Sequence, residues 1–536
     1  MQLLRCINFC AVLFCVLTSR YVCAKDDTDN RFRIDRIIVQ NHNIFSESGA
    51  DTIFIHRWAN QLHTNTQVSV ILDSLNFKTH DVVDIKQLQE SQRILRRLPY
   101  ISDAKVYVAD KNFFTDQSSH GKTIIVETWD NWSLLPTLNF SHRDNENKYT
   151  FGAKEDNLLG LGVGARLNYQ SGKDRSGYLF AMNAPLKWIE HGNVSSSFYN
   201  NNDGKAFFFD LDKPFYALDT RYSFSVNVQN EIRIDTIMQN GQDLSQYRHR
   251  INFVNSQFGW MVRRTDNSAA RLLIGVTRNE HEFTLQQMKP IPMHRDDNYI
   301  WLGYEYLQDD FEVLRNIRFI NKNEDINLGW HHRITFGVET ENVRKVNVPG
   351  YHVNWVASKG SLIGAHLWLM RMQGFASLAT KNRDFYRVDL LSEYFHHFND
   401  KWIGYGRGKL TFSKNLPLDM LNSLGDEEGI RGFPDDYQHG DNTWQARAEL
   451  RYIPNINLYQ LADLGWVVFT DIGKASGGRS KFNSYKDVIA SIGIGARIYS
   501  SKSSFGNVAH IDLVYPFSKD PKIGGFEWRF IVRSHF

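Results

Sequence analysis

Residues 526–536 read Phe-Glu-Trp-Arg-Phe-Ile-Val-Arg-Ser-His-Phe, and their alternate positions fall into two sets. One set is apolar and mostly aromatic: Phe526, Trp528, Phe530, Val532 and Phe536. The other is polar: Glu527, Arg529, Arg533 and His535. Because alternate residues of a β-strand point to opposite faces, the stretch predicts a strand with one apolar and one polar face.

The same alternation recurs through residues 132–536, in segments of roughly 10 residues separated by Gly, Asn and Asp. Residues 221–228 and 444–452 show it clearly. A soluble β-sandwich also alternates, but it would have to bury this aromatic face in a far smaller core. The pattern therefore predicts an all-β transmembrane barrel with a polar lumen. Roughly sixteen to nineteen segments can be counted, and sixteen antiparallel strands is preferred because single-chain bacterial barrels have even strand numbers.

Residues 1–24 predict a secretory signal peptide. Arg5 precedes an apolar run at residues 7–17, and a small residue, Ala24, marks the expected cleavage site. The run is shorter than the roughly 20 apolar residues that span a bilayer, which disfavours an anchor helix. A lipoprotein modified at Cys23 is a second alternative, disfavoured by the bulk of the residues before it.

All four cysteines lie within this leader, at positions 6, 10, 15 and 23. The mature chain would then hold no disulfide framework and no catalytic thiol. The formal net charge is only +3, which disfavours a nucleic-acid surface. Aromatic residues make up 13% of the chain, with only 12 prolines, and this favours strands over helices.

Residues 32–128 predict a small α/β domain of order β-α-α-β-β. A strand near residues 34–39 precedes a helix near residues 51–62. A second helix begins at Asp84, which forms a capping box with Gln87. Strands near residues 104–109 and 122–129 follow. An unrelated small α/β domain would give the same pattern.

No sequence motif indicates an enzyme. The chain lacks a Gly-x-Ser-x-Gly elbow, a phosphate-binding Walker loop and a His-Glu-x-x-His pair. The adjacent histidines 331–332 and 396–397 would point to opposite faces of a strand and so could not hold a metal together. We therefore expect no catalytic residues, no cofactor and no metal ligands.

Two motifs remain, and both concern the barrel lumen. Residues 430–433 read Ile-Arg-Gly-Phe within a long polar segment between two clear strands. Residues 469–473 read Phe-Thr-Asp-Ile-Gly, and alternation puts Phe469 and Asp471 on the lumen side. A loop that folds inward would carry Arg431 into the lumen, where a buried cation needs a carboxylate partner. Asp471 is the candidate.

Taken in this order, the motifs resemble the BamA/TamA-like superfamily of outer-membrane assembly factors. Its members have periplasmic polypeptide-transport-associated (POTRA) domains followed by a sixteen-stranded barrel. The loop tetrad of the family is matched by Ile430, Arg431, Gly432 and Phe433, and its strand motif by Phe469, Asp471 and Gly473. Residues 155–160 resemble its early barrel turn, and Phe526, Trp528, Phe530 and Phe536 its carboxyl-terminal barrel signal. One departure is a single periplasmic domain, which puts membership of the main assembly machine in doubt. Two-partner secretion transporters are also disfavoured, because the sequence indicates neither a second periplasmic domain nor a preceding plug helix.

The resemblance implies an outer-membrane location in a Gram-negative cell, with residues 32–128 as one POTRA-like domain in the periplasm and residues 132–536 as the barrel. It implies that the chain assists insertion or translocation of polypeptides, with the lipid bilayer and unfolded clients or periplasmic proteins as partners. Pro136 in the first barrel strand lacks an amide donor and would weaken a seam with the last strand. The alternative is a passive pore or a structural envelope protein.

Overall fold

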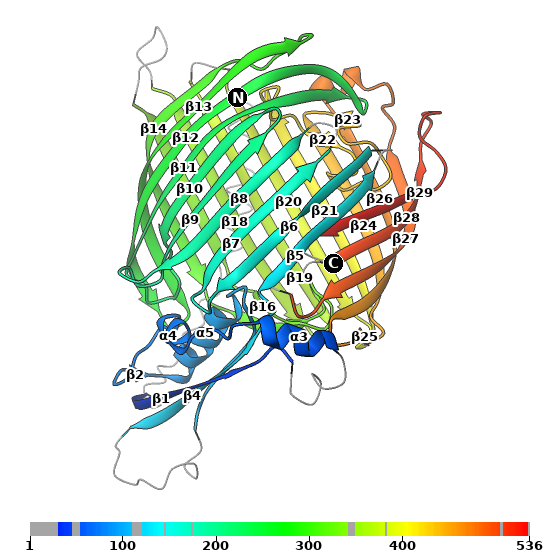
Figure 1. The fold of residues 1–536 in the computed structure, drawn as a ribbon. Coiled ribbons are helices and arrows are strands. Elements are labelled where there is room, and N and C mark those ends of the chain that lie inside the picture. The colour runs from blue at the N-terminus through cyan, green and yellow to red at the C-terminus, as the bar shows by residue number, and fades with distance from the viewer. Residues whose placement is uncertain are drawn as a thin grey trace.

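The computed structural model describes residues 31–45, 54–109, 121–143, 146–172, 175–340, 349–380, 383–503 and 508–533. They form one large antiparallel sheet curled into a barrel and a small α/β domain at one of its ends (Figure 1). The end that carries the small domain is called the near end below, and the opposite one the far end. The leader with its four cysteines and Phe536 lie outside the described residues.

Among the described residues, the barrel contains twenty strands of seven residues or more and the two-residue β25 (Asn457–Leu458). The twenty are β5 (Leu134–Arg143), β6 (Glu146–Leu158), β7 (Val163–Ser171), β8 (Ser176–Leu186), β9 (Gly192–Asn201), β10 (Gly204–Lys213), β11 (Tyr222–Gln239), β12 (Gln242–Thr265), β13 (Ser268–Gln287), β14 (Arg295–Gln308), β17 (His331–Glu339), β18 (Tyr351–Ile363), β19 (His366–Leu378), β20 (Phe385–His397), β21 (Trp402–Lys414), β24 (Asn442–Tyr452), β26 (Ala462–Ser476), β27 (Ile489–Ser500), β28 (Val508–Phe517) and β29 (Glu527–Arg533).

The prediction of about sixteen strands was therefore wrong, because short polar strands were merged or missed. Strand β9 contains three serines in succession, and its side chains show almost no alternation of burial. It joins β10 through a two-residue turn, so in the sequence the two read as one bent segment. Pairing with neighbours on both sides, rather than amphipathic alternation, defines such strands.

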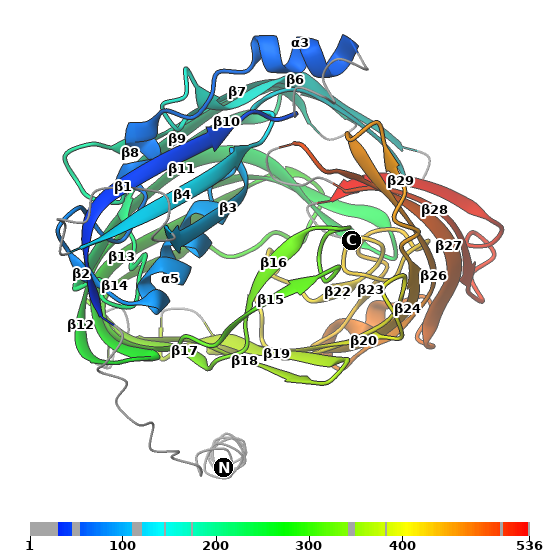
Figure 2. The same cartoon turned by 90° about the horizontal axis from the view of Figure 1, so that it is seen from below.

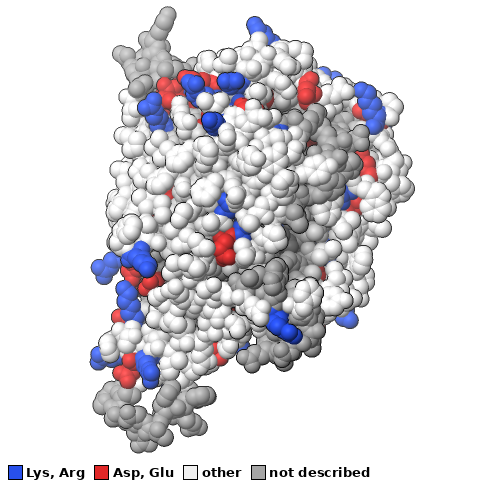
Figure 3. Space-filling view, viewed as in Figure 1, with Lys and Arg blue, Asp and Glu red and all other residues white. Residues whose placement is uncertain are grey.

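The predicted alternation of faces is present where the strands are long. On β14, Ile300 and Leu302 are 54% and 65% exposed on the outside, while Trp301 between them is 7% exposed toward the lumen. Figure 3 shows the resulting surface, with a broad middle zone poor in charge and most charged groups near the two ends. Within the described residues, no helix has the length and apolarity to span a membrane.

The barrel order returns to its start through a weak junction between its first and last strands. Most neighbours in the sheet pair over seven or more residues, whereas among the described residues β29 pairs with β5 only at Phe530 and His142. Pro136 is exposed on β5, in the part of the strand that has no pairing with β29 among the described residues. On the near-end side, the Trp132 amide donates to the Lys502 carbonyl across 2.8 Å, which ties the start of β5 to the β27–β28 turn.

The small domain has a four-stranded sheet in the order β2-β1-β4-β3, with β1 and β4 parallel. Its elements are β1 (Phe32–His42), α3 (Phe54–Leu62), α4 (Val68–Asp73), β2 (Val82–Val83), α5 (Ile85–Arg96), β3 (Ile101–Val108) and β4 (Lys122–Asp130). Helix α5 begins at the predicted capping box of Asp84 and Gln87. The order β-α-α-β-β was incomplete, because the six-residue α4 and two-residue β2 are too short to show a period.

Helix α3 corresponds to the helix predicted near residues 51–62, and it does not cover the small sheet. It lies apart, beneath the barrel rim (Figure 2). Ala59 clusters with Ile44 and Phe45, against Trp132 and Leu461 of the barrel side. Helices α4 and α5 supply the residues that cover the small sheet, with Ile71, Leu88 and Leu95 in its core.

A hairpin from the near end, β15 (Phe311–Arg315) and β16 (Asn323–Asn327), enters the ring of barrel strands (Figure 2). Helix α5 holds its base: Arg96 Nε donates to Asp325 across 2.8 Å, and Arg93 donates to Asp309 across 3.2 Å. The Arg93 guanidinium also lies 4.2 Å from the centre of the Phe311 ring. The small domain is thus connected to a segment inside the barrel.

We predict that Arg96→Ala loosens this connection. It leaves the Asp325 carboxylate, only 13% exposed, without its bidentate partner, at a cost of about 1–3 kcal/mol. Amide hydrogen exchange should accelerate in residues 309–327. Lys78→Ala is the matched control, because its ion pair with Glu190 also bridges domain and barrel but is 77% and 53% exposed and contributes little. Equal exchange in the two variants would contradict the prediction.

Candidate functional site in the barrel lumen

The segment between β21 and β24 folds into the barrel and carries the predicted tetrad at its tip. Two short strands, β22 (Ser423–Leu424) and β23 (Gln438–His439), pair to close its neck. The Ile430 amide donates to the Gly425 carbonyl across 2.8 Å, and the Asp426 amide donates to that of Phe433 across 3.1 Å. This segment, residues 415–441, is called the inward loop below.

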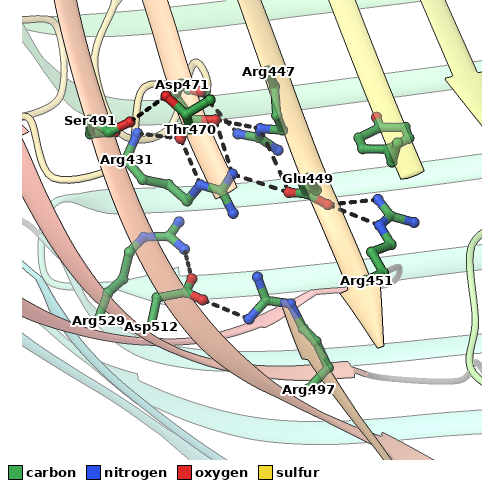
Figure 4. Close-up of polar contacts among 12 residues, drawn as sticks. Arg431, Arg447, Glu449, Arg451, Thr470, Asp471, Ser491, Arg497, Asp512 and Arg529 are labelled. Carbon is green, nitrogen blue, oxygen red and sulfur yellow. Dashed lines mark hydrogen bonds and ion pairs between the residues drawn. The ribbon is translucent and has the colours of Figure 1, made fainter. Parts of the chain in front are cut away.

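The tetrad is buried, and each of its members has a distinct role. Ile430 and Phe433 lie in an apolar cluster with Tyr437, at 2% exposure or less. Gly432 has a φ of +82°, and a Cβ there would lie 2.9 Å from Val514, so the turn requires glycine. Arg431 is 2% exposed and points into the barrel wall (Figure 4).

Arg431 is fully engaged by the strands it meets. Its Nε and Nη2 donate to the two carboxylate oxygens of Asp471 across 2.7 and 2.9 Å, and Nη2 also donates to Glu449 across 3.1 Å. The guanidinium carbon lies 3.4 Å from the centre of the Phe469 ring. This bidentate pairing with a stacked ring is specific to arginine.

Both carboxylates have a second arginine partner on the wall. Arg447 donates to Asp471 across 2.8 Å and also to the Gly429 carbonyl across 2.9 Å. Arg451 donates to the other oxygen of Glu449 across 3.0 Å. Strand register explains the first contact, since Arg447 and Asp471 are direct partners on β24 and β26.

A second chain of ion pairs connects the inward loop to the last strand. Arg529 of β29 donates to Asp426 of the loop across 2.9 Å and to Asp512 of β28 across 3.2 Å. Arg497 of β27 donates to the same Asp512 across 2.6 Å. Arg529 is 4% exposed and Asp512 fully buried, so water does not compete for these bonds.

The near-end hairpin reaches the same network. The Ile317 carbonyl accepts a hydrogen bond from Arg451 across 3.2 Å, and Ile320 lies in the apolar cluster that contains Phe469. Contacts therefore run without a break from α5 through the hairpin to Glu449 and Arg431.

Glycines on the lumen face make room for the large side chains. A Cβ on Gly493 would lie 2.4 Å from the Phe469 ring, and one on Gly473 would lie 3.1 Å from Ile430. The strand-motif glycine therefore accommodates the first residue of the tetrad.

The structure brings together the residues of both sequence motifs. Ile430, Arg431, Gly432 and Phe433 meet Phe469, Asp471 and Gly473 at one place. The strand-end aromatics lie elsewhere: Phe526 and Trp528 are 72% and 68% exposed on the outer surface, and Phe530 is half-buried at the seam. Pro136 lies on the seam strand β5, and Phe536 lies outside the described residues.

The sequence reasoning missed Asp426, Arg497 and Asp512 as members of the network. Their signal is weak, because a lumen charge on one strand indicates a partner only when the register of the next strand is known. Asp512 faces Arg529 directly across β28 and β29, which follows from the pairing and not from any spacing along the chain.

The family model of the haemolysin secretion/activation proteins ShlB/FhaC/HecB matches residues 372–498. This stretch runs from β19 to β27 and includes the inward loop with Arg431, Glu449 and Asp471. The predicted relation to the BamA-like outer-membrane superfamily is confirmed. The expectation that disfavoured two-partner secretion transporters is not supported, because the matched family is named for haemolysin secretion.

Solved structures with a similar arrangement include CdiB from Acinetobacter baumannii, which is 12% identical over 99% of this chain and 97% of that one, with a TM-score of 0.45. BamA from Haemophilus ducreyi lacking POTRA domains 1–3 is 13% identical over 93% of this chain and 84% of that one, with a TM-score of 0.40. A comparison with curated proteins gives no match.

We predict that Arg431→Met releases the inward loop. Removing one member of a buried ion pair costs about 3–5 kcal/mol, because the remaining charge is stranded. A nitroxide can be attached to a cysteine introduced by Glu427→Cys in a chain that starts at residue 25, which has no other cysteine. This nitroxide should become mobile in its electron paramagnetic resonance spectrum. Arg333→Met is the control, since Arg333 is also a lumen arginine but donates to Gln257, away from the loop. A spectrum as immobile as the parent's would refute the locking role.

A second prediction concerns pH. Burial, with Asp436 nearby, raises the pKa of Glu428 in the inward loop from 4.5 to about 7. The docked loop therefore binds a proton more tightly than the released loop, and docking should weaken as pH rises from about 4.5 through 7. The same nitroxide should be more mobile at pH 8 than at pH 5.5, conditions on the two sides of a pKa of about 7. Glu428→Gln should remove this dependence; a persisting one would assign it to another group.

Proposed function

We propose that this chain is an outer-membrane protein that assists the insertion or translocation of polypeptides. Two observations together carry the proposal. The seam has one residue pair in the part of the chain that the structure describes, and a buried network connects the tetrad loop to that seam. The match of residues 372–498 to a family named for haemolysin secretion supports the same class.

The location rests on the outer surface of the barrel. Side chains such as Ile300, Leu302 and Val468 are half exposed or more. A soluble monomer rarely exposes a continuous apolar surface of this extent, whereas a transmembrane barrel requires it. With residues 1–24 as a signal peptide, we propose that the near end faces the periplasm.

The small domain is proposed to be a single POTRA-like domain. Its sheet order β2-β1-β4-β3, with two helices over one face, is compatible with this assignment. It places α5 at the near end, where it contacts the hairpin inside the barrel. A client or periplasmic partner that binds the domain would thereby act on a segment that reaches Arg451 and the network.

The proposed mechanism is opening of the seam between β5 and β29. Few backbone hydrogen bonds must break there, and opening exposes strand edges that an incoming strand can extend. The inward loop controls the last strand through the Asp426–Arg529 ion pair, so loop release and seam opening are coupled. No catalytic step is involved.

A passive pore is the second candidate, and the lumen itself favours it. A cavity of about 670 Å³ lies between β12 and β20, lined by aromatic and polar side chains that include Trp301, Arg333 and Asp389. Such a lining would select solutes by charge. High single-channel conductance, with unchanged levels of other outer-membrane proteins on depletion, would favour this reading.

We predict that a disulfide across the seam blocks function. His142→Cys with Phe530→Cys joins β5 to β29 at their pair, whereas Ala509→Cys with Val532→Cys joins β28 to β29 as a matched control. Oxidation should abolish the assembly or secretion activity of the first variant, reversibly on reduction, and spare the control. Full activity of the oxidised seam variant would rule out lateral opening.

The outer-membrane proteome of a depleted strain tests the function itself. Particular barrel or secreted proteins should disappear on depletion and also when Arg431→Met replaces the parent at equal abundance. An unchanged proteome in both strains would favour the pore.

A further inference from the structure

Three acidic or imidazole side chains converge at the far end of the barrel, apart from the network above. Asp297 of β14, Glu339 of β17 and His352 of β18 have one oxygen or nitrogen each, all within 4.8 Å of one another. They are 9%, 7% and 5% exposed. Three neighbouring strands therefore contribute one side chain each to a closed site.

Strand register explains the convergence. Glu339 pairs with Tyr299, and Asp297 lies two residues before Tyr299 on the same face. His352 pairs with Gly337, which lies two residues before Glu339 on its face. All three therefore point into the lumen as diagonal neighbours, at a separation that long side chains bridge.

The imidazole is oriented from both sides. His352 Nδ1 lies 3.1 Å from the Ser377 hydroxyl of β19, while Nε2 lies 3.2 Å from Glu339. The Tyr299 ring stacks on the imidazole at 4.2 Å between centres. A Cβ on Gly350 would lie 2.4 Å from the Glu339 carboxyl carbon, so a glycine at that position leaves room for the carboxylate.

Asp297 is the feature that points to a ligand. Its side chain is nine-tenths buried, and no described residue donates a hydrogen bond to it. A carboxylate in such surroundings is costly unless a cation neutralises it. A second carboxylate, that of Glu339, lies within the same few ångströms and adds to the repulsion.

We infer that Asp297, Glu339 and His352 bind a divalent transition-metal ion, with Zn²⁺ the best fit. One imidazole nitrogen and two carboxylate oxygens are ligands that Zn²⁺ accepts, and a fourth position is left for water. The Ser377 hydroxyl positions the His352 ring so that Nε2 faces the ion. Bound metal would tie the far ends of β14, β17 and β18 together.

The inference departs from the expectation of no metal ligands drawn from the sequence. That expectation considered only histidines adjacent in the chain. Here the ligands lie at positions 297, 339 and 352, and only the pairing of three strands brings them together.

A second histidine cluster serves as an internal control. His249, His281 and Asp419 also have ligand atoms within 4.8 Å of one another. Each is already hydrogen-bonded: His249 to Asp235 at 2.8 Å and to His281 at 2.9 Å, and Asp419 to Arg295 by two bonds of 2.7 Å. The difference lies in the aspartates: Asp419 already has a cationic partner in Arg295, whereas no described residue donates a hydrogen bond to Asp297.

The experiment is Zn²⁺ binding to the untagged full-length mature chain in detergent, measured by equilibrium dialysis at micromolar free metal. We expect one equivalent, and an absorption spectrum typical of low coordination number when Co²⁺ is used instead. Asp297→Asn and His352→Gln should each weaken binding by at least ~100-fold, more than the loss of an orienting residue usually costs. His249→Gln should bind like the parent.

Ser377 separates a positioning role from a merely structural one. Ser377→Ala should weaken Zn²⁺ binding by about 10-fold, and Ser377→Thr, which keeps the hydroxyl, should restore it. Heat-dependent gel mobility would check that each barrel is folded. Absence of stoichiometric binding by the folded parent, equal binding by Asp297→Asn, or loss of binding in His249→Gln would overturn the proposal.

Discussion

A buried carboxylate in the barrel wall is tolerated only if a cation reaches it, and Asp471 imposes this constraint on the lumen. It is fully buried on β26, where its direct cross-strand partner Arg447 supplies one ion pair. The second comes from outside the wall, from Arg431 at the tip of the inward loop. The electrostatics of one strand thus determine where a loop of more than twenty residues must lie. Because Arg431 also stacks on Phe469, this position is specific to arginine.

The same loop determines the state of the last strand. Asp426 accepts a hydrogen bond from the Gly432 amide within the loop and another from Arg529 of β29. Strand β29 pairs along its length with β28 on one side, and on the other side its described residues make a single pairing with β5. Its place in the barrel therefore depends on lumen ion pairs more than on backbone hydrogen bonds at the seam. Because β29 is held mainly by ion pairs, its edge toward β5 could open while strands β24 to β28 stay rigid.

The small domain is connected to this system through the near-end hairpin. Arg93 and Arg96 of α5 hold the base of the hairpin, and its tip meets Arg451 and the cluster of Phe469. Events at the domain and at the seam therefore share one set of contacts. The far-end cluster of Asp297, Glu339 and His352 is separate, and its effect would be to stiffen strands on another part of the wall.

The sequence by itself determined the strand alternation, the capping box at Asp84, and the lumen orientation of Arg447, Glu449 and Asp471, because each depends on spacings of a few residues. It also identified the tetrad and the strand motif. It misjudged the number of strands, where polar strands such as β9 lack alternation, and it left open which surface α3 packs against. Only the tertiary structure decided which charges pair, since the contacts of Asp512 with Arg529 and of Glu339 with His352 depend on strand register. Register is set by backbone hydrogen bonds between strands distant in the chain, and local sequence carries little record of it.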